Sequence, residues 1–137
     1  MAPALMASIL LTACVTSCTA APTPTPDSAS AVASAKDVCW ELSNLGTLVY
    51  NMERGKATGR IPGEEFQGAM YLAVSMLDRI HPSDDTDVNS ALDRLKAAAG
   101  TYEVDPGSTA WRLAFADVSE SCGVVLGEFG VTAWVSG

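Results

Sequence analysis

The side chains of this sequence with the most chemical capability are four cysteines and one histidine. Cys14 and Cys18 lie in an apolar stretch near the first residue, whereas Cys39 and Cys122 lie far apart in the rest of the chain. His81 stands directly before a proline, which is typical of a loop or helix-end residue. One histidine cannot assemble a metal site of the usual His and Cys type if the cysteines have other roles. We therefore expect no metal and no cofactor.

Residues 4–11 form an apolar run that is too short to span a membrane. As a helix it would cover roughly 12 Å, whereas the hydrocarbon core of a bilayer is about 30 Å thick. The run leads into Leu11-Thr12-Ala13-Cys14, which resembles the lipobox of bacterial lipoproteins. The resemblance implies that residues 1–13 are a signal peptide, that cleavage falls between Ala13 and Cys14, and that the Cys14 thiol receives a diacylglyceryl group.

Residues 14–34 are predicted to form a disordered linker behind this cysteine. They are rich in Thr, Ser, Ala and Pro, with Pro22, Pro24 and Pro26 alternating with threonine. Such a composition cannot bury a core and favours an extended chain. The linker would hold a folded domain away from the membrane. Cys18, which follows a poorer lipobox, is the alternative site of lipidation.

Apolar residues recur at helical spacing in four segments, near residues 34–55, 62–80, 83–100 and 108–126. Their stripes consist of Val38, Leu42, Leu45, Val49 and Met52; Phe66, Met70, Ala73, Leu77 and Ile80; Val88, Leu92, Leu95 and Ala99; and Trp111, Phe115, Val118, Cys122 and Val125. Stripes of this kind with mostly short links predict an all-α fold, an antiparallel up-down four-helix bundle. The domain would cover residues 35–137 and end in a short extended tail, with residues 131–135 lying along the bundle.

The bundle places two cysteines at the same level. Cys39 lies about one turn into the first helix, and Cys122 about one turn before the end of the last helix. In the up-down order these helices run antiparallel side by side, and an exported protein meets oxidising conditions. We therefore predict a Cys39–Cys122 disulfide.

The charge balance and the motifs exclude several functions. Eight Lys and Arg stand against sixteen Asp and Glu, so there is no basic patch with which to bind nucleic acid. The stretch that begins at Asp85 opens like a calcium loop, but Ser90 replaces the required glycine and Lys96 the required glutamate. No nucleophile elbow is present either. We expect a protein that is not an enzyme.

The segment of residues 62–80 is apolar over a wide arc and contains adaptable methionines. Phe66, Met70 and Met76 are therefore candidates for a binding groove. The interpretation that we prefer for the methionines and several aromatic residues is that they fill the core, with the groove as the alternative; these residues are Met70, Met76, Trp40, Tyr50 and Tyr71.

With its lipobox, its Thr/Pro linker and its cysteine pair, the chain resembles small alanine-rich surface lipoproteins of high-GC Gram-positive bacteria and their phages. This resemblance implies a protein anchored by lipid to the outer face of the bacterial cell membrane. We expect a non-catalytic binding or interaction module with an envelope protein as its partner. One alternative is a structural or exclusion lipoprotein that blocks an envelope component. A hydrolase with a site built from scattered Ser, Asp and Glu residues is a further alternative.

Overall fold

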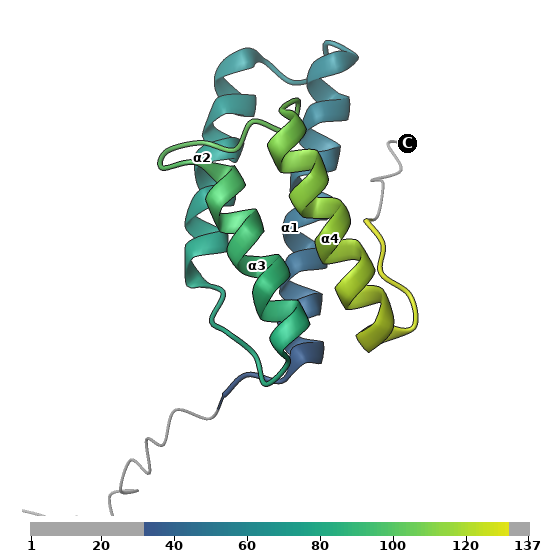
Figure 1. Ribbon diagram of the computed structural model, residues 1–137. Coiled ribbons are helices and arrows are strands. Elements are labelled where there is room, and N and C mark those ends of the chain that lie inside the picture. The colour runs from purple at the N-terminus through teal and green to yellow at the C-terminus, as the bar shows by residue number, and fades with distance from the viewer. Residues whose placement is uncertain (1–31, 132–137) are drawn as a thin grey trace, which may run out of the picture.

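The computed structural model describes residues 32–131, which contain four helices and no strand. The helices are α1 (Ala35–Ala57), α2 (Gly63–Arg79), α3 (Thr86–Ala99) and α4 (Thr109–Leu126). The chain reverses direction at each link, so that α1 and α3 run one way and α2 and α4 the other (Figure 1). The prediction of an all-α fold with four helices is confirmed.

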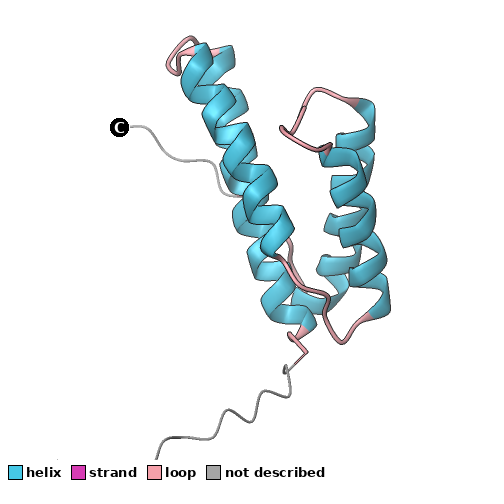
Figure 2. Cartoon of the chain, turned by 90° about the vertical axis from the view of Figure 1, so that its left-hand side faces the viewer, coloured by secondary structure: helices cyan, strands magenta, loops and turns pink. Residues whose placement is uncertain are grey.

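The helices form two antiparallel pairs, α1 with α2 and α3 with α4 (Figure 2). α1 also packs against α4, whereas contact between α2 and α3 is sparse. The two pairs lie close together where the described chain begins, which we call the base, and diverge toward the opposite end, which we call the distal end (Figure 2). No helix among the described residues is long and apolar enough to cross a membrane.

Helix ends follow local side-chain chemistry at most positions. Ser34, Asp85 and Ser108 each occupy an N-cap and accept hydrogen bonds from backbone N–H groups in the first turn of α1, α3 and α4. The predicted end of the first helix at Gly55 is wrong, because α1 continues to Ala57. The Gly55 carbonyl instead accepts the N–H groups of the following link, and a Cβ at this position would collide with the side chain of Ile61.

The core is built from the predicted stripes. Within the four stripes only Phe66, Phe115 and Val125 are half-buried, and every other member is buried. The interpretation of three aromatic residues as core filler is wrong, since Trp40, Tyr50 and Tyr71 are 54%, 40% and 48% exposed. Each lies on its helix outside the buried stripe, so the stripe was a better guide to burial than hydrophobicity alone.

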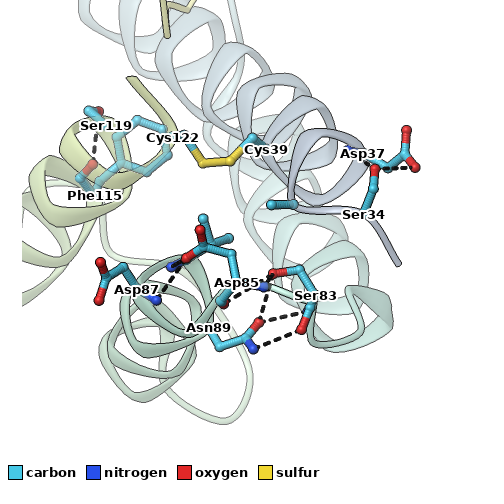
Figure 3. The surroundings of a disulfide bond; sticks show 12 residues. Ser34, Asp37, Cys39, Ser83, Asp85, Asp87, Asn89, Phe115, Ser119 and Cys122 are labelled. Atoms are coloured by element: carbon cyan, nitrogen blue, oxygen red, sulfur yellow. Dashed lines mark hydrogen bonds between the residues drawn. A yellow bond between two sulfur atoms is a disulfide. The ribbon is translucent and has the colours of Figure 1, made fainter. Parts of the chain in front are cut away.

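A disulfide between Cys39 and Cys122 links α1 to α4 near the base, as predicted (Figure 3). Both residues are fully buried, and their Cα atoms are 5.4 Å apart. The bond joins positions separated by 83 residues. On the chain-entropy model, closing a loop of this length stabilises a folded domain by about 4 to 5 kcal/mol.

The chain turns back after α4 and lies against the bundle. Gly127 ends the helix with a φ of 77°, which glycine adopts without strain. The Ser43 hydroxyl then donates a hydrogen bond to the Gly130 carbonyl at 2.6 Å, and Phe129 packs at 6.0 Å from Phe115, measured between ring centroids. The predicted strip of residues 131–135 is described only at Val131, and the rest of it lies outside the described residues.

Candidate binding groove

The distal end of the bundle holds a groove of about 750 Å³. It lies between the end of α1, the start of α2 and the link between α3 and α4. We call it the distal groove and define it by six of its lining residues: Glu53, Lys56, Phe66, Met70, Glu103 and Asp105. In Figure 2 this link reaches from the α3–α4 pair toward the α1–α2 pair.

Unequal helix lengths explain why a groove forms there. α2 has 17 residues and α3 has 14, so α3 is about 4 to 5 Å shorter at 1.5 Å per residue. Contact between these two helices is sparse, and the groove lining includes residues from the first turns of α2 but none from α3. The link from Gly100 to Ser108 spans the remaining distance, and its buried residues Val104 and Pro106 fasten it to the bundle.

The floor of the groove is apolar. Met70 and Val104 are buried, and Phe66 is half-buried. The Lys56 ammonium nitrogen lies over the Phe66 ring, 4.0 Å from its centroid. This distance is well within the range of a cation–π contact, so the aromatic floor already holds one positive charge of the protein itself.

Three carboxylates and one ammonium group line the groove. Glu53 comes from α1, and Glu103 and Asp105 come from the link between α3 and α4. One Asp105 carboxylate oxygen accepts a hydrogen bond from the Gly107 N–H at 3.1 Å, which stabilises the turn. Neither Glu53 nor Glu103 forms an ion pair with another described residue. The lining therefore has a formal charge of −2, from three acids and Lys56.

An apolar recess of about 300 Å³ adjoins the distal groove on the side of α4. We call it the aromatic recess and define it by Tyr50, Trp111, Arg112, Phe115 and Val131. The Trp111 and Phe115 rings stack with their centroids 5.9 Å apart. The recess shares three lining residues with the distal groove, namely Glu53, Pro106 and Gly107, so the two hollows are adjacent.

The predicted groove residues are brought together only in part. Phe66 and Met70 line the distal groove, whereas Met76 lies half-buried near the other end of α2 and packs against the core. Sequence reasoning missed Glu53, Glu103 and Trp111. Glu103 and Asp105, which lie on either side of Val104, are the local sequence feature from which an acidic site in this link could have been predicted.

The other candidate positions have structural roles or lie elsewhere. Ala13, Cys14 and Cys18 lie outside the described residues, so the predicted cleavage and lipidation stay predictions.

Asp85 accepts hydrogen bonds from the N–H groups of Asp87 and Val88, which makes it the cap of α3. His81 is exposed in the link between α2 and α3. In the part of the chain that the structure describes, no three His, Cys, Asp or Glu residues are grouped so as to hold a metal ion.

The fold and the groove together define a disulfide-linked four-helix domain with an open, acidic and partly aromatic distal surface. No protein-family model matches the chain, and neither the curated proteins nor the solved structures contain a match.

Proposed function

We propose that the chain is a lipid-anchored extracytoplasmic protein of the bacterial envelope, a non-catalytic module that presents its distal groove to an envelope protein partner. The observation that carries this proposal is the position of the groove. It is lined by the end of α1 and the start of α2 at the distal end of the bundle, whereas the described chain begins at the base, before α1 (Figure 1).

This position suits a protein that is tethered by its N-terminal leader. α1 alone is about 34 Å long, so the groove lies roughly that far from the start of the folded domain. Acyl chains on Cys14 would give stable attachment without help from the acidic domain, because each buried methylene contributes about 0.8 kcal/mol. A domain held at its base would leave the groove at the end of the bundle opposite to the tether.

The disulfide supports an extracytoplasmic location, since such bonds persist in oxidising compartments and are rare in the cytosol. The groove composition supports binding. Its described lining combines apolar floor residues with carboxylates and one lysine, a mixture suited to holding a ligand by shape and charge.

The anchor is tested by labelling cells with radioactive palmitate and separating membrane from medium. We expect the wild-type chain to be labelled and to sediment with the membrane, and Cys14→Ser to lose both properties. Cys18→Ser serves as the matched control and should behave like the wild type. An unlabelled wild-type chain that keeps residues 1–13 would contradict the anchor.

The binding role is tested with a photo-crosslinking amino acid placed in intact cells. Gln67 is exposed and lines the distal groove, whereas Asp93 is exposed on α3 away from it. We expect one discrete adduct with an envelope protein from position 67 and none from position 93. Equal adducts from both positions, or none from either, would contradict a groove-directed binding function.

A further inference from the structure

The charge on the distal groove favours a cationic ligand. Three carboxylates from two separate elements line it, and Lys56 is the one cationic residue among its described lining residues, while Arg112 adds a positive charge in the adjoining recess. Glu53 and Glu103 have no ion-pair partner among the described residues, so their charges are available to a bound molecule. A ligand cation that contacts either carboxylate would gain a charge-assisted hydrogen bond, which is stronger than a neutral one.

Lys56 marks a place that a cation already occupies. Its ammonium group rests on the Phe66 ring, although Glu53 lies one helical turn earlier on the same helix. The groove thus offers two kinds of attraction for a positive charge, an aromatic face and free carboxylates. Lys56 uses only the first of them.

The aromatic recess adds an apolar subsite next to the acidic one. Tyr50 and Glu53 are one turn apart on α1, so their side chains are neighbours on the same face of the helix. A ligand that uses both subsites must carry a positive group and an apolar group a short distance apart. Alternate side chains of an extended peptide are about 6.6 to 7 Å apart on one face, which suits this requirement.

We infer that the distal groove and the aromatic recess bind an extended basic segment of the partner protein. A Lys or Arg side chain would enter the distal groove, where Glu53, Glu103 and Asp105 attract it, and an apolar side chain two positions away would enter the recess beside Trp111. The inference rests on the proposed binding function and specifies the chemistry of the partner.

The affinity test uses the full-length lipidated chain in neutral detergent micelles. The probe is a fluorescein-labelled seven-residue peptide with Lys-Ala-Leu at its centre and glycines around it, measured by fluorescence anisotropy. We expect Glu53→Gln and Glu103→Gln each to weaken binding about three- to tenfold, the loss of one charge-assisted contact. Glu41→Gln, the same change at an exposed position of α1 outside both hollows, should leave the affinity unchanged.

Two further variants distinguish binding in the hollows from nonspecific electrostatic attraction of the peptide to an acidic protein. Lys56→Gln removes the resident cation and should tighten binding about two- to fivefold, because the lining changes from −2 to −3. Tyr50→Ala should weaken binding of the Leu peptide, whereas Tyr71→Ala, an exposed tyrosine on α2 outside both hollows, should not. A peptide with Lys-Ala-Ser should bind more weakly than the Leu peptide.

Several outcomes would overturn the inference. Equal losses from Glu41→Gln and Glu53→Gln would mean nonspecific attraction to the net charge of −8. Equal affinities for the Ser and Leu peptides would mean that the site binds only the positive group and that the aromatic recess binds no apolar side chain. A tenfold gain after deletion of residues 132–137 would mean that the chain's own tail fills the hollows.

Failure of this inference is distinguishable from failure of the binding function. If the adduct from position 67 forms in cells but is unchanged by Glu53→Gln and Glu103→Gln, a groove-binding partner exists and its recognition is not by a basic segment. If no adduct forms, the binding function itself fails.

Discussion

The base and the distal end of this bundle differ in how closely their helices are joined. At the base the helices converge, the disulfide joins α1 to α4, and buried polar groups are paired. At the distal end the helix pairs diverge (Figure 2). A groove opens there, and two carboxylates in its lining have no ion-pair partner among the described residues. The contrast indicates that the base supplies much of the stability, and that the charged groups of the distal end contribute little to it.

The base owes its order to a compact set of hydrogen bonds around Ser83 (Figure 3). The Ser83 N–H donates to the Asn89 side-chain oxygen at 2.7 Å, and the Asn89 amide donates back to the Ser83 carbonyl at 2.9 Å. Ala33 pairs with Ser83 in an isolated bridge, and the Ala35 N–H donates to the Asp84 carboxylate at 2.9 Å. The start of α1 is thereby fastened to the link between α2 and α3.

The largest expected effect comes from breaking the disulfide. Cys39→Ala with Cys122→Ala should lower the free energy of unfolding by about 4 kcal/mol, because the unfolded chain regains the entropy of an open loop of 83 residues. Urea unfolding followed by circular dichroism measures the change. Wild-type protein alkylated at other thiols is the control, and a loss below about 1 kcal/mol would contradict a base that dominates stability.

The next effect concerns the hydrogen bonds of the base. Asn89→Ala should cost about 1 to 3 kcal/mol, because the backbone of the buried residue Ser83 loses both of its partners in the Asn89 side chain. Ser90→Ala on the same helix removes only an exposed hydroxyl bond within α3 and is the matched control. Indistinguishable melting curves for the two variants would show that the network around Ser83 adds nothing.

A third variant tests the close approach of α1 and α4 between the two ends. A Cβ at the buried residue Gly46 would collide with the Phe115 ring and lie 2.8 Å from a Val131 methyl group. Gly46→Ala should therefore cost about 1 to 3 kcal/mol through overpacking.

The matched control for this variant is Gly68→Ala on α2. A Cβ at Gly68 meets nothing within 4 Å, so the substitution should instead stabilise the domain by about 0.5 to 1 kcal/mol. Thermal unfolding of the two variants in parallel measures the change in stability of each and shows whether one falls while the other rises. Shifts in the same direction would show that the contact between Gly46 and Phe115 is not close in solution.

The smallest effects are expected at the distal groove. Glu53→Gln and Glu103→Gln change exposed carboxylates without ion-pair partners among the described residues, so each should alter stability by less than about 0.5 kcal/mol. Differential scanning calorimetry checks this. A decrease in stability of 2 kcal/mol or more would contradict the difference between the two ends, since the groove residues would then stabilise the fold.

Prediction from sequence succeeded where local chemistry decides the structure. Helical stripes predicted most of the residues that are buried, because side chains three and four positions apart share one face of a helix. The pairing of Cys39 with Cys122 also followed, because both positions fall at one level once adjacent helices run antiparallel.

Prediction of the site was incomplete because its parts come from separate elements. Phe66 and Met70 were found from the apolar arc of α2, but the same arc also suggested Met76, which packs against the core. Nothing in a stripe indicates where a neighbouring helix is too short to cover it. Glu53 and Glu103 are 50 positions apart by their numbers, and only folding brings them to one groove.

The sequence by itself determined the four helices, their buried faces and the cysteine pair, since each depends on spacing along a single helix or on simple up-down order. The tertiary structure alone decided that α3 leaves the start of α2 uncovered, that the link after α3 carries two carboxylates to the gap, and that an aromatic recess adjoins it. Those features depend on how helices of unequal length lie against one another, and no periodicity within one helix records that.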